Sequence, residues 1–228
     1  MKERPILFSA PMVRAILHDH KTQTRRIMKP QPTTEVRSGC MGHWSIAPDV
    51  REFKCPYGEY GETGDRDRLW VRETWAETDL PDGTPVISYR SGACIPIGKK
   101  DGKDGQDYLI HDWAMQDTPK PDHWRPSIHM PRWASRILLE IIDVRVQRLQ
   151  DITEEDAKAE GALAWAANEA LQDCKITAKD MDEWLVKYGN GKPGIRNAFA
   201  ALWESIHGEG SWAENPYVWA IQFRRIEK

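Results

Sequence analysis

A short polar segment near the N-terminus combines a lysine with threonine hydroxyls and two arginines. It reads Lys21-Thr22-Gln23-Thr24-Arg25-Arg26. A lysine beside a threonine can act as a base where burial and nearby cations lower its pKa. Arg25, Arg26 and Lys29 are such cations, and a guanidinium can also hold a phosphate or carboxylate. A basic, solvated strand start has the same composition, so both interpretations stay open for this segment.

A second candidate is an acidic residue at the end of a short predicted helix. The stretch from Thr153 to Gly161 reads TEEDAKAEG, and its first acids suit a helix start, where the dipole favours negative charge. Glu160 instead lies about two turns on, where the dipole disfavours a carboxylate. A residue placed against its local preference is a functional candidate.

Charged and aromatic residues also mark one predicted strand. Gly64-Asp65 is a turn signal that leads into LWVRETWA, Leu69 to Ala76. Alternation puts Arg72 and Glu73 on opposite faces, so one of them faces inward and needs a partner.

The loop RPSIHMPRW holds two arginines, a histidine and a tryptophan between prolines. These residues are Arg125, His129, Arg132 and Trp133. The mixture suits binding of a base or phosphate. A proline-stiffened loop that covers the domain explains it equally well.

Zinc is a minor possibility, and several common enzyme classes lack their motifs. Cys40, His43 and Cys55 offer three ligand types, but the spacing matches no strong zinc pattern and a fourth ligand is not evident. The sequence contains no P-loop, GxGxxG, GxSxG or HExxH motif, so kinase, dehydrogenase, serine hydrolase and zincin interpretations lose support.

The elements that position these residues alternate between strands and helices. Ser9 is predicted to cap a helix that contains Pro11 and stops near Asp19 or His20. Predicted strands are Ile6 to Phe8, Lys21 to Ile27, Leu69 to Ala76, Val86 to Tyr89, Arg136 to Leu149 (one bent strand or a hairpin) and Tyr217 to Ile226. Further helices are predicted at 154 to 160, at 178 to 188 with Thr177 as cap, and at 195 to 207, with Phe199, Leu202, Trp203 and Ile206 inward.

Two polar excursions interrupt this order, at about 30 to 66 and 91 to 126. We therefore predict one α+β domain over 1 to 228, a small barrel with flanking helices and two long loop insertions.

Composition excludes some classes of protein. The chain has 228 residues, 40% hydrophobic and 29% charged, with a net charge of −3. Binding of nucleic acid through bulk positive charge is thereby excluded, so any such contact must be local. No apolar run approaches the roughly 20 residues of a membrane helix.

The cysteines and the N-terminus predict a cytoplasmic protein. Four cysteines are widely scattered, and MKERPILFSAPMVR has no signal-peptide pattern. Eleven tryptophans against four phenylalanines is unusual, and tryptophan suits either core filling or stacking on bases.

In this order, the segments resemble the ASCH domain of the PUA-like β-barrel superfamily, especially ASCH proteins of bacteriophages and prophages. The segments that carry the resemblance are the first helix with Lys21-Thr22-x-Thr24-x-Arg26, the Gly64-Asp65 turn with LWVRETW, RPSIHMPRW, DITEEDAKAEG at 151 to 161 and NPYVWAIQF at 215 to 223. The chain departs from it at His18-Asp19-His20, where relatives usually have a glycine, and in a longer Gly64-to-Leu69 turn.

The resemblance implies a small barrel whose cleft accepts a nucleoside, nucleotide or RNA. One branch of the superfamily is a bacterial amidohydrolase that removes the acetyl group from acetylcytidine. Its lysine, threonine and glutamate fall here on Lys21, Thr24 and Glu160. Lys21 would then be the base toward Thr24 or water, Glu160 would shuttle the proton, and Arg26 would orient substrate or oxyanion, with no cofactor, metal or obligatory protein partner.

Two other functions stay open. A non-catalytic RNA- or modified-base-binding module would hold a base against Trp75 or Trp133, with arginines on phosphate. A metal-dependent ribonuclease would take Glu160 with Asp or His as ligands. We also expect Arg72, Glu73, Arg125, His129 and Arg132 among the substrate-binding residues.

Overall fold

The computed structural model describes residues 2–32, 36–37, 45–46, 55–57, 67–80, 83–97, 121–166 and 194–226. Its elements follow one another as β1 Glu3–Leu7, α1 Ala10–Leu17, β2 Gln23–Ile27, β3 Val36–Arg37, β4 Ser45–Ile46, β5 Arg68–Arg72, β6 Trp75–Asp79, β7 Pro85–Tyr89, β8 Ala93–Pro96, β9 Leu138–Arg148, α2 Glu154–Ala159, α5 Ile195–His207 and β10 Tyr217–Ile226. Short 3-10 turns lie at Ser127–His129, Arg132–Ala134 and Leu149–Asp151. The α+β class is therefore confirmed.

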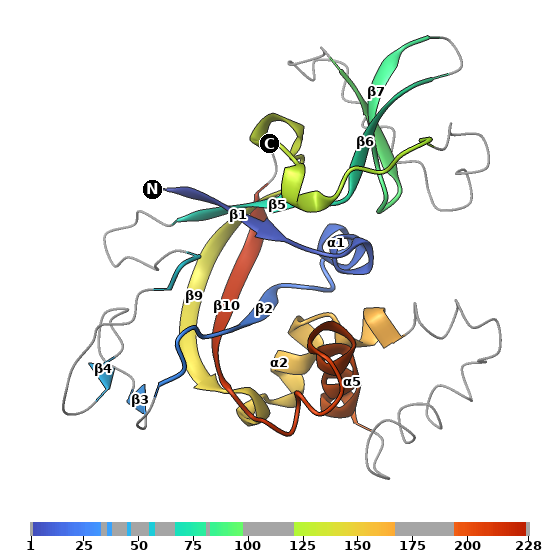
Figure 1. The fold of residues 1–228 in the computed structure, drawn as a ribbon. Helices are drawn as coiled ribbons and strands as arrows, with labels where there is room; N and C mark the ends of the chain where they lie inside the picture. Colours follow the sequence, from blue (N-terminus) through green and yellow to red (C-terminus); the bar gives the residue numbers. More distant parts are fainter. Residues whose placement is uncertain are drawn as a thin grey trace, which may run out of the picture.

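The main sheet has five strands in the order β1-β5-β9-β10-β2. Only β1 and β5 run parallel, and the other pairs are antiparallel. The long strands β9 and β10 bend together across the molecule (Figure 1), with a register shift between Gln222 and Phe223. A bulge of this kind bends a strand and increases its twist. The β-branched run in β9 forms one bent strand, which settles the choice between strand and hairpin.

The sheet is open among the described residues, so the predicted barrel is not confirmed. Its two outer strands, β1 and β2, are connected through α1 and do not pair with each other. A side chain spans this gap instead: Arg26 donates from Nη2 to the carbonyl oxygen of Leu7 at 2.6 Å. The two edges therefore approach each other without a backbone ladder.

A second, three-stranded sheet is formed by β6, β7 and β8. The segment Leu69 to Ala76, predicted as one strand, is two strands that belong to different sheets, with a break at Glu73 and Thr74. Glu73 is buried at this break and pairs with Arg136 at 2.9 Å. An inward carboxylate needs such a partner, and the pair joins the two sheets where the strand direction changes.

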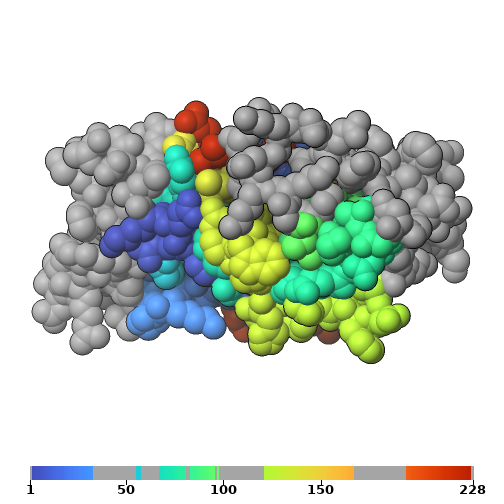
Figure 2. Space-filling model, turned by 90° about the horizontal axis from the view of Figure 1, so that it is seen from above, coloured from blue at the N-terminus to red at the C-terminus, as the bar shows by residue number. Residues whose placement is uncertain are grey.

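Both predicted excursions are mainly outside the described residues. Within the second, β8 forms a strand, and Arg125 makes an isolated bridge to Trp75, so part of that range is ordered sheet structure. Figure 2 shows the yellow-green segment after residue 121 lying between the N-terminal strand, in blue, and the green β6–β7 hairpin.

The helices begin and end close to the predicted positions. Thr153 caps α2 by accepting from the backbone N–H of Asp156 at 3.1 Å, and Gly161 follows its end with φ +77°. In α5, Phe199, Leu202 and Trp203 are buried as predicted, but Ile206 is 60% exposed. The predicted helix at 178 to 188 and its cap Thr177 lie outside the described residues.

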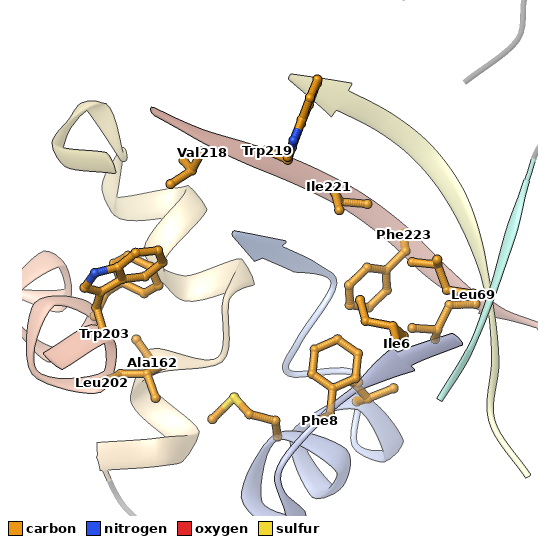
Figure 3. Close-up of a cluster of buried hydrophobic side chains, with 14 of the residues drawn as sticks. Ile6, Phe8, Leu69, Ala162, Leu202, Trp203, Val218, Trp219, Ile221 and Phe223 are labelled. Carbon is orange, nitrogen blue, oxygen red and sulfur yellow. The ribbon is translucent and has the colours of Figure 1, made fainter. Parts of the chain in front are cut away.

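The core lies between the main sheet and the helices. Side chains from β1, β5 and β10 pack together with Phe8 in one part of the core, namely Ile6, Leu69 and Phe223, while Leu202 and Trp203 pack near Ala162 (Figure 3). In β10, residues 217–221 are all buried, so both faces of the strand are covered there. No helix among the described residues is long and apolar enough to cross a membrane.

The end of α2 offers a test of local packing. A Cβ added at Gly161 would lie 3.3 Å from Lys21 Cβ, whereas one added at Gly210, with φ +81°, would meet nothing within 4 Å. We expect Gly161→Ala to lose about 1–2 kcal/mol from left-handed strain plus a further crowding cost. Gly210→Ala should lose the strain alone. Urea unfolding of both variants measures the difference, and equal losses would contradict close packing at Lys21.

Candidate functional site

A cavity of about 340 Å³ lies between α1, β2, the end of α2 and α5. Its polar wall contains Lys21, Thr24, Arg25, Arg26 and Glu160. The structure therefore brings together the three residues predicted to be catalytic and the arginine predicted to orient the substrate. They come from segments far apart in the sequence.

The turn after α1 positions Lys21 at this cavity. Asp19 adopts a left-handed conformation, with φ 57°, and the backbone N–H groups of His20 and Lys21 both donate to the carbonyl of Ala15. An aspartate tolerates this conformation better than most residues. The chain then reverses and enters β2 with the lysine side chain directed inward.

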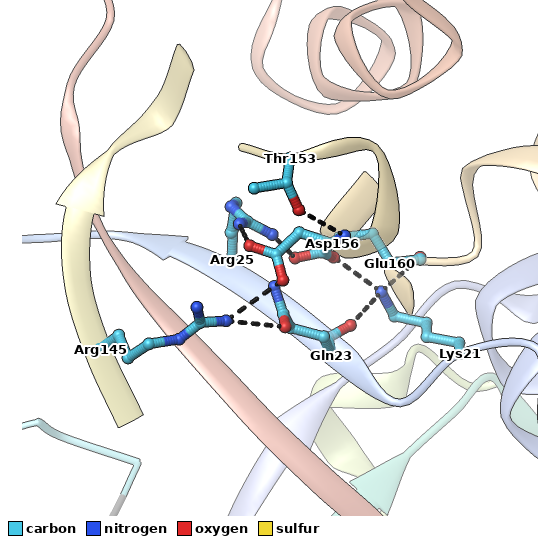
Figure 4. Close-up of polar contacts among 7 residues, drawn as sticks. All are labelled: Lys21, Gln23, Arg25, Arg145, Thr153, Asp156 and Glu160. Atoms are coloured by element: carbon cyan, nitrogen blue, oxygen red, sulfur yellow. Dashed lines mark hydrogen bonds and ion pairs between the residues drawn. The ribbon is translucent and has the colours of Figure 1, made fainter. Parts of the chain in front are cut away.

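Lys21 is buried, and its ammonium group has three acceptors (Figure 4). Nζ donates to the carbonyl of Gln23 at 2.8 Å, to the carbonyl of Glu160 at 2.7 Å and to Glu160 Oε2 at 3.0 Å. An ammonium has three N–H donors, so all of them are used here. One of these acceptors is the backbone carbonyl of the C-cap residue of α2, at the helix end where a cation is favourable.

Glu160 is the C-cap residue of α2 and is as buried as Lys21. Its second carboxylate oxygen, Oε1, accepts from Arg25 Nη1 at 3.0 Å. The carboxylate therefore lies between a lysine and an arginine, which explains its place at a helix end that disfavours negative charge.

The pairing continues beyond the cavity to Asp156 and Arg145. Arg25 Nη2 bonds to Asp156 at 2.8 Å, and Arg145 Nη2 contacts both Asp156 and the side chain of Gln23 at 3.2 Å (Figure 4). Burial alone would raise the pKa of Asp156, but Arg25 and Arg145 outweigh it and lower that pKa. The network ties β2 to α2 and β9.

Burial is the main influence on the pKa of Lys21. It lowers the pKa of the ammonium by penalising the charged form; Glu160 acts in the opposite direction, and Arg26 and Arg25 add to the lowering. Burial likewise lowers the pKa of the Arg26 guanidinium. Both cations lie over the ring of Phe8, with Lys21 Nζ 5.7 Å and Arg26 Cζ 5.3 Å from its centroid.

Thr24 lies in β2 between these charges. It is 4% exposed, it lines the cavity, and its backbone is paired with Ile221 of β10. The backbone pairing fixes the position from which its hydroxyl can reach the cavity.

A further part of the lining comes from α5, and the sequence did not predict it as part of a site. Phe199, Leu202, Trp203 and Ile206 line it, together with His207. The periodic apolar pattern of α5 predicts core packing, and nothing in it indicates that the same face borders a cavity. His207 stacks on Trp203 with ring centroids 4.1 Å apart. Ser127 and Thr74 contribute polar groups to the lining.

The other predicted substrate-binding residues do not line this cavity. Arg72 donates to the carbonyl of Ile128 and stacks on Trp70, while Glu73 is held by Arg136 and Ser91. These contacts give both side chains structural partners.

Arg125 and Trp133 of the 125–133 loop contact Trp75 of β6, outside this cavity. Trp75 is buried, contacts Trp133 edge-on and lies beneath Arg125. Arg125 pairs with Glu77 at 2.9 Å, and Arg132 pairs with Glu3 at 2.8 Å. Trp133 is 62% exposed, and His129 precedes the buried Met130 in the same loop.

The alternative of a zinc site at Cys40, His43 and Cys55 is not tested. Cys40 and His43 lie outside the described residues, and Cys55 is buried in the main hydrophobic core. Within the described ranges, no group of three or more His, Cys, Asp or Glu side chains could hold a metal ion.

Comparisons with protein-family models, curated proteins and solved structures found no match for the chain. The resemblance to the ASCH domain therefore stays a prediction from the sequence.

The buried ion pairs predict a large effect of neutralising Glu160. In Glu160→Gln, Lys21 and Arg25 lose the carboxylate that both contact, and breaking a buried pair typically costs about 3–5 kcal/mol. Glu155→Gln, in the exposed first turn of the same helix, should cost about 0.5 kcal/mol through the dipole. Urea unfolding at pH 7 compares the two, and similar losses would argue against a buried ion pair.

His207 offers a test of electrostatics at the cavity. Burial, Arg26 and Lys29 lower the pKa of its imidazole, in that order. We expect Lys29→Gln to raise this pKa, because one cation that repels the protonated ring is removed. Lys158→Gln, on α2, serves as a control that should leave it unchanged. NMR titration of the histidine ring protons measures both; an unmoved pKa in Lys29→Gln would contradict this placement of charge.

Proposed function

We propose that this protein is a nucleoside- or RNA-directed ASCH domain that hydrolyses an amide on a modified cytidine or a similar nucleoside. The observation that supports it is the convergence of Lys21, Thr24 and Glu160 on one cavity. A threonine hydroxyl, a lysine with lowered pKa and a carboxylate are the groups that metal-independent amide hydrolysis needs. The scattered cysteines also favour a cytoplasmic location for it.

The reaction would begin with proton transfer to Lys21. The neutral amine takes a proton from water, or from Thr24 Oγ1, and the resulting nucleophile attacks the amide carbon. The carbonyl electron pair moves to oxygen, and the cationic wall that includes Arg26 stabilises the resulting oxyanion. Collapse of the intermediate breaks the C–N bond, while Glu160 passes the proton from Lys21 to the leaving amine. If Thr24 attacks, water then hydrolyses the acyl ester.

The hydrogen bonds of Lys21 define what this chemistry requires. In the charged form its three donors are all engaged by Gln23 and Glu160. The base form has two hydrogens and a lone pair, so one of these bonds must be given up. Burial, which disfavours the charged form, promotes that change.

The apolar wall supports a flat substrate. Phe199, Leu202 and Trp203 offer a hydrophobic surface beside the polar groups. A nucleobase has an apolar face and polar edges, which suits a cavity with one wall of each kind.

A binding module is the second candidate, and one observation favours it. The complete use of the Lys21 donors is also what a purely structural ion pair would show. In that case the cavity would hold a modified base without reacting with it. The metal-dependent ribonuclease remains the third alternative, which the chelator in the following experiment tests.

The deciding experiment is hydrolysis of acetylcytidine by the purified chain in the presence of a chelator. We expect release of cytidine, with kcat/KM rising with pH as Lys21 loses its proton through its lowered pKa. Lys21→Ala and Glu160→Ala should each reduce kcat about 100-fold or more. Their folding must be checked by circular dichroism, because both remove buried partners.

Thr24→Val is the variant whose activity is least affected by a loss of folding stability. Thr24→Val removes the hydroxyl and keeps the shape, whereas Thr22→Val changes a neighbouring threonine that does not line the cavity. Loss of turnover in Thr24→Val alone supports the assignment. Absence of turnover by the folded parent chain, with measurable binding of the nucleoside, would instead establish the binding module.

A further inference from the structure

The charges around the cavity do not balance. Lys21, Arg25 and Arg26 line it with a single carboxylate, that of Glu160. Glu160 is shared by Lys21 and Arg25, and Arg25 has a second acidic partner in Asp156. Among the described residues, no acidic side chain forms an ion pair with Arg26. The excess positive charge therefore lies at Arg26.

Arg26 has hydrogen-bonding capacity to spare. A guanidinium has five N–H donors, and the hydrogen bond to Leu7 uses one of them, at Nη2. Its Nε–H is buried and has no partner within the described part of the chain. A partly buried cation without an acidic partner attracts an anion, so a cavity lined by one suits an anion.

Lys29 extends the positive charge from Arg26. Both Arg26 and the exposed Lys29 act electrostatically on His207, which lines the cavity. Arg26 and Lys29 thus form one cationic side of the site, next to His207. The paired charges of Lys21, Arg25 and Glu160 form another.

We propose that Arg26, assisted by Lys29, binds a phosphate group of the substrate, so that the substrate is a nucleoside phosphate, free or within RNA. The nucleoside part rests on the function proposed above; the phosphate part rests on the unpaired guanidinium. The planar fork of an arginine matches phosphate oxygens, and the apolar wall from α5 leaves the base a separate place. A free nucleotide and an RNA strand share this phosphate chemistry.

Calorimetric titration of the full chain tests this with four probes: cytidine, cytidine 5′-monophosphate, a short oligocytidylate and inorganic phosphate. We expect the monophosphate to bind about tenfold or more tightly than cytidine at low salt, with affinity falling as salt rises. If the oligocytidylate binds more tightly than the monophosphate, RNA is the source of the phosphate. If the two bind with equal affinity, the free nucleotide is the source.

Four variants distinguish the effect of positive charge on phosphate binding from an effect on folding. Arg26→Gln should weaken monophosphate binding about tenfold or more, a larger loss than the same variant causes for cytidine. Arg26→Lys retains the charge and should lose less. Lys29→Gln, at an exposed position, should give a smaller loss confined to the phosphate probes, even if the Arg26 variants fold poorly. Arg224→Gln, an exposed arginine paired with Glu140, is the matched control and should change nothing.

The outcomes distinguish this inference from the proposed function. Binding of inorganic phosphate that needs Arg26, without any nucleoside binding, supports the anion site and counts against the nucleoside function. Equal binding of cytidine and its monophosphate, unaffected by Arg26→Gln and Lys29→Gln, overturns the phosphate site and leaves nucleoside hydrolysis standing. Failure of all four probes to bind the folded chain overturns the phosphate site as well.

Discussion

The buried contact between Lys21 and Glu160 is the constraint on which the site depends. These residues are 139 positions apart, and their contact, with the backbone bond from Thr22 N–H to the carbonyl of Ala159, joins the start of β2 to the end of α2. As an outer strand of the main sheet, β2 pairs only with β10 among the described strands, so its other edge needs such an attachment. The cavity lies where the two elements meet α5.

Stability alone is a weak explanation for this arrangement. Removing two charges from water costs about as much as their attraction returns, and well-packed apolar residues often stabilise a core better. Here the carboxylate also ties in Arg25, which continues to Asp156 and Arg145. The network fixes the orientation of α2 relative to β2 and β9, and it places polar groups at one wall of a cavity whose wall from α5 is mainly apolar. A precise position for reactive groups is a reason to retain charges that stability does not require.

Local sequence rules were sufficient for most of the described elements. The capping threonine and the glycine after α2 marked both ends of that helix, and β-branched residues marked β9, because these signals depend only on neighbours in the chain. Glu160 was found because it opposes the helix dipole, a local conflict that a tertiary partner resolves.

Features that depend on distant segments of the chain were harder to predict from the sequence. The break at Glu73 depends on Arg136 in another segment, and the open edge between β1 and β2 depends on the sheet as a whole. The wall formed by α5 has the same apolar period as a buried helix face, so periodicity could not reveal a cavity beside it.

Arg26 connects the two proposals about this cavity. Its positive charge, together with that of Arg25, lowers the pKa of Lys21 beyond the effect of burial, while Glu160 raises it. A phosphate bound at Arg26 would compensate part of that positive charge and raise the proton affinity of Lys21 in the complex. The empty site would then favour the neutral amine, and the occupied site would make the same amine a stronger base once it is formed. Binding of the anion and proton transfer are therefore coupled through one guanidinium, which a neutral nucleoside cannot engage in this way.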